Sequence, residues 1–368
     1  MPKSYYTILF IILLCASSAQ AQQNWPSPEV EQMYNTANNQ LVLGNTEQAI
    51  TLFQQAIKLA PNKMILYRDL GEAYKRSGSY KEGLAIIEPV IKSGEADDRC
   101  FQIYASCLAA NNEKKKAHSV LVDGLKRFPS SGLLHHEMGI YYDSEKDQEK
   151  ALFEILTGIE VAPGYSANYF EAARIYMGSY KLVWAVIYAE IFMNLEKGTP
   201  KSDEAHDMLL GAYMRLYNSM GNSGVPQFKA DKDNNANNDF EAAVYDTYLK
   251  LSPVVSDGIN TENLTMLRTR FSMDWQQRNA YKYPFTLFMR YDNMLRIGFF
   301  DTYNQWSFAQ VDNPQQYEAW KSFHTDAIPK LEGWMETNPY IPAQTDFYNR
   351  KEVHGIFPKP EKEKGKKK

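Results

Sequence analysis

One repeat distance, the step from Ala49 to Gly83, constrains this chain more than any other feature of its sequence. Between Gly44 and Pro61 a turn dipeptide is followed by a helical pattern with small Ala49 and Ala56, bulky Phe53 and a closing proline. Further steps of the same length from Ala49 again reach only small residues, namely Ala117, Ala151 and Ala185. The same steps from Phe53 reach Ile87, Leu121, Ile155 and Ala189, and those from Pro61 reach Glu95, Pro129, Pro163 and Lys197. A fixed period of about 34 residues predicts a stack of similar helical units.

A second column of small residues lies in the first half of each unit. Five units follow one another without an insertion and begin at Val30, Met64, Asp98, Gly132 and Ser166. The eighth residue of every unit is small, at Ala37, Gly71, Ala105, Gly139 and Ala173. Small residues at positions 8 and 20 let two helix axes approach closely, and position 24 fills the seam with the next unit. The pattern therefore predicts five pairs of packed helices.

These columns resemble the signature of the tetratricopeptide repeat (TPR) family over residues 30–199. Leu70-Gly71-x-x-Tyr74 matches the family pattern, and Met138-Gly139-x-x-Tyr142 nearly matches it. The resemblance implies an all-α fold, a solenoid of helical hairpins wound as a right-handed superhelix. In such superhelices the first helix of each pair lines a concave groove that holds protein segments. The fifth and ninth positions of the repeats are then groove residues, at Tyr34, Asn38, Arg68, Glu72, Gln102, Ser106, His136, Ile140, Phe170 and Arg174.

A degenerate sixth repeat is predicted over residues 200–253. Asp203–Asn218 has the pattern of a first helix. Phe240–Leu251 has the pattern of a second helix, and it leads into Ser252-Pro253 much as Leu59 leads into Ala60-Pro61. Residues 219–239 between them are rich in Asn, Asp and Gly, so we expect an inserted loop there.

This insert contains part of a calcium-loop pattern at Asp231, Asp233, Asn235 and Asp239. Ala236 and Ala242 stand where such a loop needs a glycine and a bidentate glutamate. We therefore predict no metal in the loop. Asp239 is expected instead to cap the helix that follows.

The chain changes character after Pro253. From Phe240 to Tyr348 there are 22 aromatic residues, and the repeat period is lost. Residues 254–345 are expected to form an aromatic-rich helical C-terminal domain, with helices at Thr261–Asn279, Pro284–Phe300 and Pro314–Thr337. Two interpretations of the aromatics remain open: they form a core that closes the solenoid, or they form a stacking surface for sugars or peptides. Residues 346–368 are expected to be a disordered basic tail.

The N-terminus has the three parts of a secretory signal peptide, with Lys3, an apolar run from Ile8 to Ala16 and a small-x-small site at Ala19-Gln20-Ala21. We expect cleavage of residues 1–21, a linker at 22–29, and a mature chain that is soluble and periplasmic or envelope-associated. Cys15 leaves a lipid anchor open, although Leu14 occupies a position where lipid-anchor signals carry a small residue. No later stretch has the apolar length of a membrane span, so membrane association is expected only through partners.

Composition gives no support to nucleic-acid binding or to catalysis. The net charge is −4, which lacks the basic excess of a nucleic-acid binder. The six histidines show no metal-ligand spacing, and no nucleophile or phosphate-loop motif is present. Cys100 and Cys107 lie two turns apart on one expected helix and are interpreted as small buried hydrophobes. We therefore predict a chain without catalytic residues or cofactors.

The sequence favours an exported, non-enzymatic scaffold that holds protein partners in a bacterial envelope assembly, such as one for secretion, motility or envelope biogenesis. The repeats and the signal peptide are the basis of this hypothesis. One alternative is a glycan or peptidoglycan binder that uses the Trp-rich C-terminal part. A further alternative is an enzyme housed in that part.

Overall fold

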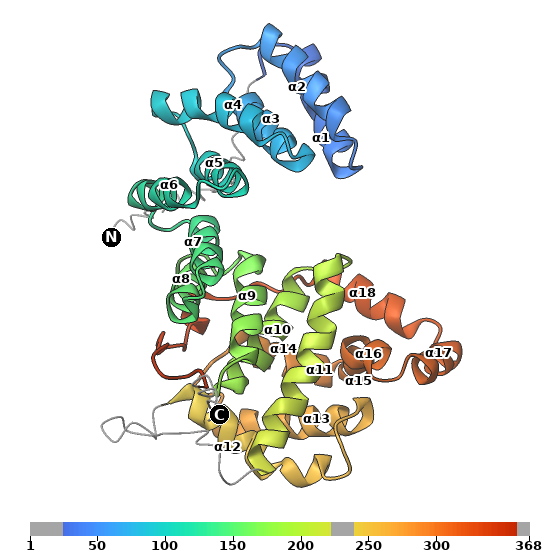
Figure 1. The fold of residues 1–368 in the computed structure, drawn as a ribbon. Helices are drawn as coiled ribbons and strands as arrows, with labels where there is room; N and C mark the ends of the chain where they lie inside the picture. The colour runs from blue at the N-terminus through green and yellow to red at the C-terminus, as the bar shows by residue number, and fades with distance from the viewer. Residues whose placement is uncertain (1–24, 222–238, 359–368) are drawn as a thin grey trace, which may run out of the picture. The chain divides into compact units, whose positions relative to one another are not determined.

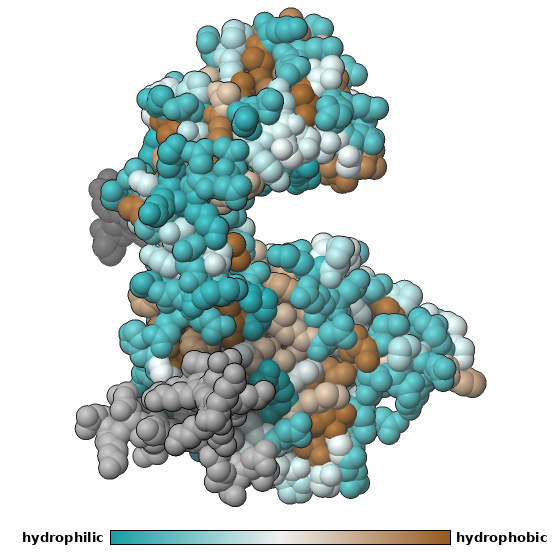
Figure 2. All heavy atoms as spheres, in the orientation of Figure 1, coloured by the Kyte–Doolittle hydropathy of each residue, from teal (hydrophilic) through white to brown (hydrophobic). Residues whose placement is uncertain are grey.

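The computed structural model describes residues 25–221 and 239–358, and these residues form α-helices, short 3-10 and π-helical segments, and no strand (Figure 1). The chain divides into two compact units, residues 1–86 and 87–368. The expected signal peptide and Asp231, Asp233 and Asn235 of the expected loop lie outside the described residues. Hydrophilic side chains cover most of the face shown in Figure 2, with apolar patches between them.

The first unit contains α1 (Pro28–Val42), α2 (Thr46–Leu59), α3 (Met64–Ser77) and the start of α4 (Tyr80–Ser93). Its core is built from Val30, Ala37, Phe53, Leu66 and Leu70 with their neighbours. The expected linker 22–29 already belongs partly to this unit. The Ser27 side chain caps α1 by accepting from the Val30 N–H, and the Trp25 ring packs on Tyr34 with centroids 4.6 Å apart.

The second unit continues the hairpins at the same period. Its repeat helices are α5 (Asp98–Ala110), α6 (Lys114–Arg127), α7 (Gly132–Ser144), α8 (Gln148–Val161), α9 (Ser166–Met177) and α10 (Leu182–Leu195). The first helices α3, α5, α7 and α9 begin at four of the five predicted repeat starts, and α1 begins at Pro28, two residues before the predicted Val30. The second helices α2, α4, α6, α8 and α10 also begin exactly one repeat apart, so the predicted register is confirmed.

A left-handed residue recurs in the turns of four hairpins. Gly44 and Gly78 have φ of 81° and 79°, and Asn112 and Lys146 both have φ of 64°. These four positions are again separated by one repeat length each. Glycine adopts this conformation without a steric penalty, whereas lysine does not, so the turn geometry is imposed on Lys146 by the packed helices on either side.

The small-residue columns bring the helices into close contact, as predicted. Ala37, Ala105 and Ala173, at the eighth position of their repeats, are almost inaccessible to solvent. A Cβ atom added to Gly139 would lie 2.6 Å from Ile155 Cδ1 and 3.1 Å from the Ala151 carbonyl oxygen. Any larger side chain at that position would therefore force α7 and α8 apart.

The last repeats and the C-terminal part share one core. The described helices of the sixth repeat are α11 (Pro200–Gly221) and α12 (Phe240–Lys250), joined by a 3.0 Å hydrogen bond between the hydroxyls of Tyr213 and Tyr248. A single apolar cluster extends from Ala151 to Ile356 and includes α10, which is buried on all sides. Residues 254–345 were expected to form a domain of their own. They pack instead directly on the repeats.

The C-terminal helices differ in part from those expected. A 3-10 turn at Ser252–Val255 precedes α13 (Thr261–Arg278), and α14 (Thr286–Arg296) is shorter than predicted. The helix predicted at Pro314–Thr337 is wrong, because His324–Asp326 breaks it into α17 (Pro314–Phe323) and α18 (Ala327–Thr337). Nothing in the sequence predicted the segment between α14 and α17. It comprises α15 (Phe300–Asn304), a π-helical turn (Gln305–Ala309) and α16 (Gln310–Asp312).

A fully buried ion pair joins α10 to the C-terminal helices. The Arg268 guanidinium of α13 contacts the Glu190 carboxylate of α10, and both side chains are 0 % exposed. Tyr291 and Tyr303 donate to the same carboxylate, and Arg268 also donates to Asn304. Burial opposes the charge of Arg268, but Glu190 together with the surrounding tyrosines more than offsets that effect and raises the Arg268 pKa. Sequence reasoning missed this pair, because its members are far apart in the chain and follow no repeated spacing.

Part of the expected tail is ordered. After a 3-10 turn at Gln344–Asp346, Tyr348 stacks on Phe240 with ring centroids 4.5 Å apart. The Asn349 amide donates to the Tyr176 hydroxyl at 2.8 Å, and the Tyr180 N–H donates to the Ile356 carbonyl at 2.9 Å. The prediction of disorder from residue 346 is therefore wrong for residues 346–358. We call this segment the strap.

Candidate functional site

Two predicted groove residues of the first unit, Tyr34 and Arg68, bond to the same carboxylate, that of Asp69. The Tyr34 hydroxyl donates to Asp69 Oδ2 at 2.8 Å, and Arg68 pairs with the other oxygen of Asp69 at 2.8 Å. The Asn38 amide donates to the Tyr34 carbonyl oxygen at 3.1 Å. A polar ladder therefore links the first helices of repeats one and two.

Glu72 lies at the end of this ladder, paired with Lys75 at 2.7 Å and Arg76 at 2.9 Å. Burial opposes the charge of Glu72, but these two cations outweigh it and lower the Glu72 pKa. The carboxylate is thus held in its charged form although it is buried.

The same ladder recurs in the second unit. Gln102 donates to Glu137 Oε1 at 3.0 Å and Ser106 donates to Oε2 at 3.4 Å. His136 Nδ1 lies 3.8 Å from Glu137 Oε1, and the His136 ring packs edge-on against Tyr165. Burial, with Glu137 adding to it, raises the pKa of Tyr165 to about 12. Neither ring nitrogen of His136 has a hydrogen-bond partner among the described residues.

Arg174 on α9 adds a charged side chain next to this ladder. Its Nη2 lies 2.8 Å from Asp143 and its Nε lies 2.7 Å from Glu171. Ile140 of α7 is 37 % exposed, which gives an apolar point on a polar face. We call the six residues Gln102, Ser106, His136, Glu137, Ile140 and Arg174 the first-helix surface.

Phe170 does not belong to this surface. It is only 3 % exposed, its ring packs on Phe192 with centroids 5.0 Å apart, and Lys201 covers it from the other side. Its expected place in the groove is wrong, because α10 and α11 use it as core.

Sequence reasoning also missed the acceptors of the ladder, Asp69 and Glu137. Both occupy the sixth repeat position, one residue beyond a predicted groove position. The recurrence of an acidic residue there was a signal that could have identified them.

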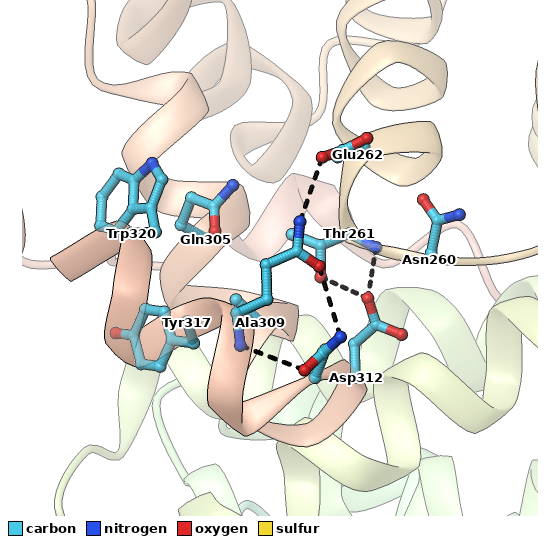
Figure 3. A pocket seen from close by; sticks show the side chains of 10 residues that line it. Asn260, Thr261, Glu262, Gln305, Ala309, Asp312, Tyr317 and Trp320 are labelled. Atoms are coloured by element: carbon cyan, nitrogen blue, oxygen red, sulfur yellow. Dashed lines mark hydrogen bonds between the residues drawn. The ribbon is translucent and has the colours of Figure 1, made fainter. Parts of the chain in front are cut away.

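A second candidate site is a cavity of about 340 Å³ in the C-terminal part. It lies between the start of α13, the π-helical turn with α16, and α17. Figure 3 shows Trp320 and Tyr317 on one side of it and Asn260, Thr261 and Asp312 on the other. Its polar lining consists mainly of amides and carboxylates, from Asn260, Glu262, Gln305, Asp312, Asn313 and Gln316.

Several of these side chains hold the walls of the cavity together. Asp312 Oδ2 accepts from both the N–H and the hydroxyl of Thr261 at 2.8 Å. Gln316 donates to Glu262 at 3.3 Å (Figure 3). The Tyr317 and Trp320 rings lie nearly parallel, with centroids 6.2 Å apart. The cavity is therefore framed by contacts between α13, α16 and α17.

Aromatic residues elsewhere in the C-terminal part are mostly core. Trp275 and Phe271 are almost fully buried, and each packs against Phe288. Asp239 caps α12 by accepting from the Glu241 N–H at 2.9 Å, as predicted. Within the described ranges, no group of three or more His, Cys, Asp or Glu side chains could hold a metal ion.

Comparison with known proteins identifies the repeats. Residues 42–78 match the family model described as TPR repeat. The chain carries tetratricopeptide repeats. Their helical hairpins continue at the same period to α10. A search of curated proteins finds no match for this TPR protein.

Solved TPR structures align with parts of the chain. A thermophilic TPR protein from Thermus thermophilus is 17 % identical over 49 % of this chain and 99 % of its own, with a TM-score of 0.44. PilF of Pseudomonas aeruginosa is 15 % identical over 54 % and 94 %, with a TM-score of 0.41. A TPR protein from Parabacteroides merdae is 15 % identical over 70 % and 92 %, with a TM-score of 0.35. The TPR assignment rests on the matched repeat and the register, not on these alignments.

Proposed function

We propose that this TPR protein is an exported, non-enzymatic scaffold whose first-helix surface holds a protein partner in a bacterial envelope assembly. TPR repeats are consistent with a scaffold for protein–protein interaction. The observation that carries the proposal is the ladder of side chains from three successive first helices, Gln102 and Ser106 on α5, Glu137 on α7 and Arg174 on α9.

This surface suits a protein segment for two reasons. Gln102, Ser106 and Arg174 are held in place by hydrogen bonds to a neighbouring repeat, so less side-chain entropy is lost when a partner binds. It also combines a partly exposed apolar residue, Ile140, with amide, hydroxyl and charged groups that match a polypeptide backbone and its side chains.

The proposed export rests on the signal-peptide pattern of residues 1–21. No helix within residues 25–221 and 239–358 has the length and apolarity to cross a membrane. Expression in a Gram-negative host, followed by mass measurement of the periplasmic fraction, tests this part of the proposal. A chain that keeps residues 1–21 and stays in the cytoplasm would contradict it.

The partner site is tested by site-specific photo-crosslinking in intact cells. A benzophenone amino acid at position 140 is expected to capture a defined protein partner. The matched control is position 153 on α8 of the same repeat, because Phe153 is also apolar and 43 % exposed but lies on a second helix. Cross-links of equal yield from both positions, or none from position 140, would rule out the first-helix surface as the binding site of the partner.

A pair of substitutions sharpens this test. With the benzophenone amino acid placed at position 106, Ile140→Asp is expected to abolish cross-linking of the protein partner. The substitution would put a charge at the apolar point of contact. Phe153→Asp should leave that cross-linking unchanged. Thermal melts of both variants separate lost binding from lost folding.

A further inference from the structure

We propose that the cavity between α13, the π-helical turn and α17 is a binding site for a neutral saccharide unit of one or two sugar rings. This inference does not rest on the scaffold function, because the cavity lies far along the chain from the first-helix surface. Its volume of about 340 Å³ is within the range of small-ligand pockets.

The chemistry of the lining favours a ligand with many hydroxyl groups. Four amide side chains reach the cavity, from Asn260, Gln305, Asn313 and Gln316. An amide both donates and accepts hydrogen bonds, as a sugar hydroxyl does. The Asn260 and Asn313 oxygens already cap α13 and α17, and Gln316 already donates to Glu262, so among these four Gln305 is the amide that can pair with a hydroxyl in either direction. Tyr317 and Trp320 add an apolar wall for the C–H faces of a sugar ring.

Charged ligands fit less well. None of the described lining residues is Lys, Arg or His, so an anion would lack a counter-charge. A cation would need the two carboxylates, but Asp312 already accepts two hydrogen bonds from Thr261, and Glu262 accepts one from Gln316.

The π-helical turn (Gln305–Ala309) provides an independent indication. Such turns disturb the helical hydrogen-bond ladder and are found frequently at functional sites. Here the turn is supported from outside the cavity. The Ser307 hydroxyl donates to the Tyr303 carbonyl at 2.7 Å, and His206 Nδ1 donates to the Ser307 carbonyl at 2.9 Å.

These hydrogen bonds hold Gln305 on the cavity wall. The Gln305 amide is half-buried beside Trp320 and makes no hydrogen bond to another described residue (Figure 3). It is thus an available donor and acceptor in a wall whose other polar groups are largely paired. We infer that Gln305 is the principal polar contact of the sugar.

Isothermal titration calorimetry with the full chain tests the proposal. The probes are neutral hexoses, N-acetylhexosamines and their short linear oligomers. At least one probe is expected to bind, and Gln305→Ala and Gln316→Ala are each expected to weaken that binding at least tenfold. The matched control is Gln277→Ala, an exposed amide on α13 outside the cavity, which should leave the affinity unchanged.

Two results would overturn the proposal. One is the absence of heat from every saccharide at millimolar concentration, including the case in which a neutral peptide mixture binds instead. The other is saccharide binding that Gln305→Ala and Gln316→Ala leave intact. Thermal melts verify that each variant is folded, and both chosen residues are half-buried or exposed, so their replacement spares the core.

Discussion

The repeats and the C-terminal part of the second unit are both all-helical, but they are held together in different ways. In the repeats, small residues such as Gly139 allow neighbouring helices to touch, and most contacts lie within one or two repeats. In the C-terminal part, aromatic rings and a buried ion pair connect segments far apart in sequence. A regular repeat distributes its stability over many similar contacts, whereas the irregular part concentrates it in a few.

The largest effect is expected at the buried ion pair. Arg268→Met should destabilise the second unit by about 3–5 kcal/mol, because it leaves the Glu190 carboxylate buried without its cation. The double variant with Glu190→Met should recover much of this loss. Urea denaturation followed by circular dichroism measures both.

Arg296→Met is the control for this comparison. Its guanidinium also pairs with a carboxylate, that of Asp292, but it is 72 % exposed, so little or no change in stability is expected. Equal losses for Arg268→Met and Arg296→Met would show that burial of the pair does not matter.

A smaller loss is expected at the repeat contacts. A Cβ atom added to Gly158 would lie 2.4 Å from Asn168 Nδ2, and Asn168 donates to the Gly132 carbonyl at 2.9 Å. Gly158→Ala should therefore cost about 1–3 kcal/mol by overpacking. Gly211→Ala in α11 is the matched control, because its Cβ would meet only Met177 Cε at 3.5 Å. That change should gain about 0.5–1 kcal/mol from reduced backbone entropy, as a melt of each variant would show.

His206 links the two regions and should make the stability of the second unit depend on pH. Burial lowers the His206 pKa, which the hydrogen bond to Ser307 only partly offsets. The unfolded chain therefore takes up a proton at a higher pH than the folded chain. Stability should fall as the pH drops below about 6.5, the ordinary histidine value, and level off below the folded pKa.

The variant His206→Gln isolates this contribution. Its unfolding free energy, measured by urea denaturation at pH 7.5 and 5.5, should change less between the two values than that of the parent chain. An unchanged or steeper pH dependence would mean that His206 is not the group responsible.

The smallest effect is expected in a repeat turn. Lys146 adopts a left-handed conformation at φ of 64°, where the equivalent residue of the first two hairpins is glycine. Lys146→Gly should stabilise the second unit by about 0.5 kcal/mol, since relief of steric strain exceeds the added entropy of the unfolded chain. Gly164 does not have a left-handed φ, so Gly164→Lys introduces no such steric strain and serves as a comparison. A lower melting temperature for Lys146→Gly would contradict the strain argument.

The fold of the repeats could be predicted because its causes are local. Gly139 on α7 lies against α8 of its own repeat and Ala37 on α1 is fully buried, so a fixed spacing is enough to find such positions. Some contacts of the predicted groove residues follow from the register for the same reason. Tyr34 and Gln102 lie where the register puts them, but Phe170 was misplaced because α10 and α11 bury it, which depends on elements outside its repeat.

The C-terminal part could not be predicted in the same way. The π-helical turn depends on His206, which lies far away in sequence on α11, and no local pattern marks it. The strap was assigned to a disordered tail together with the polar, basic run that follows it from Pro358. Its order comes from single contacts, such as that of Asn349 with Tyr176 on α9.

The sequence by itself determined the period of the hairpins, the residues that let their helices touch, and the turns that join them. These follow from sterics between neighbours in the chain, which a repeated spacing records directly. Only the tertiary structure decided that the C-terminal helices share a core with the last repeats, that Glu190 meets Arg268, and that a polar cavity forms beside Gln305. Those outcomes depend on which helices, far apart in sequence, pack against one another. Their packing decides which charges and amides are buried, and burial sets the free energy of each of these groups.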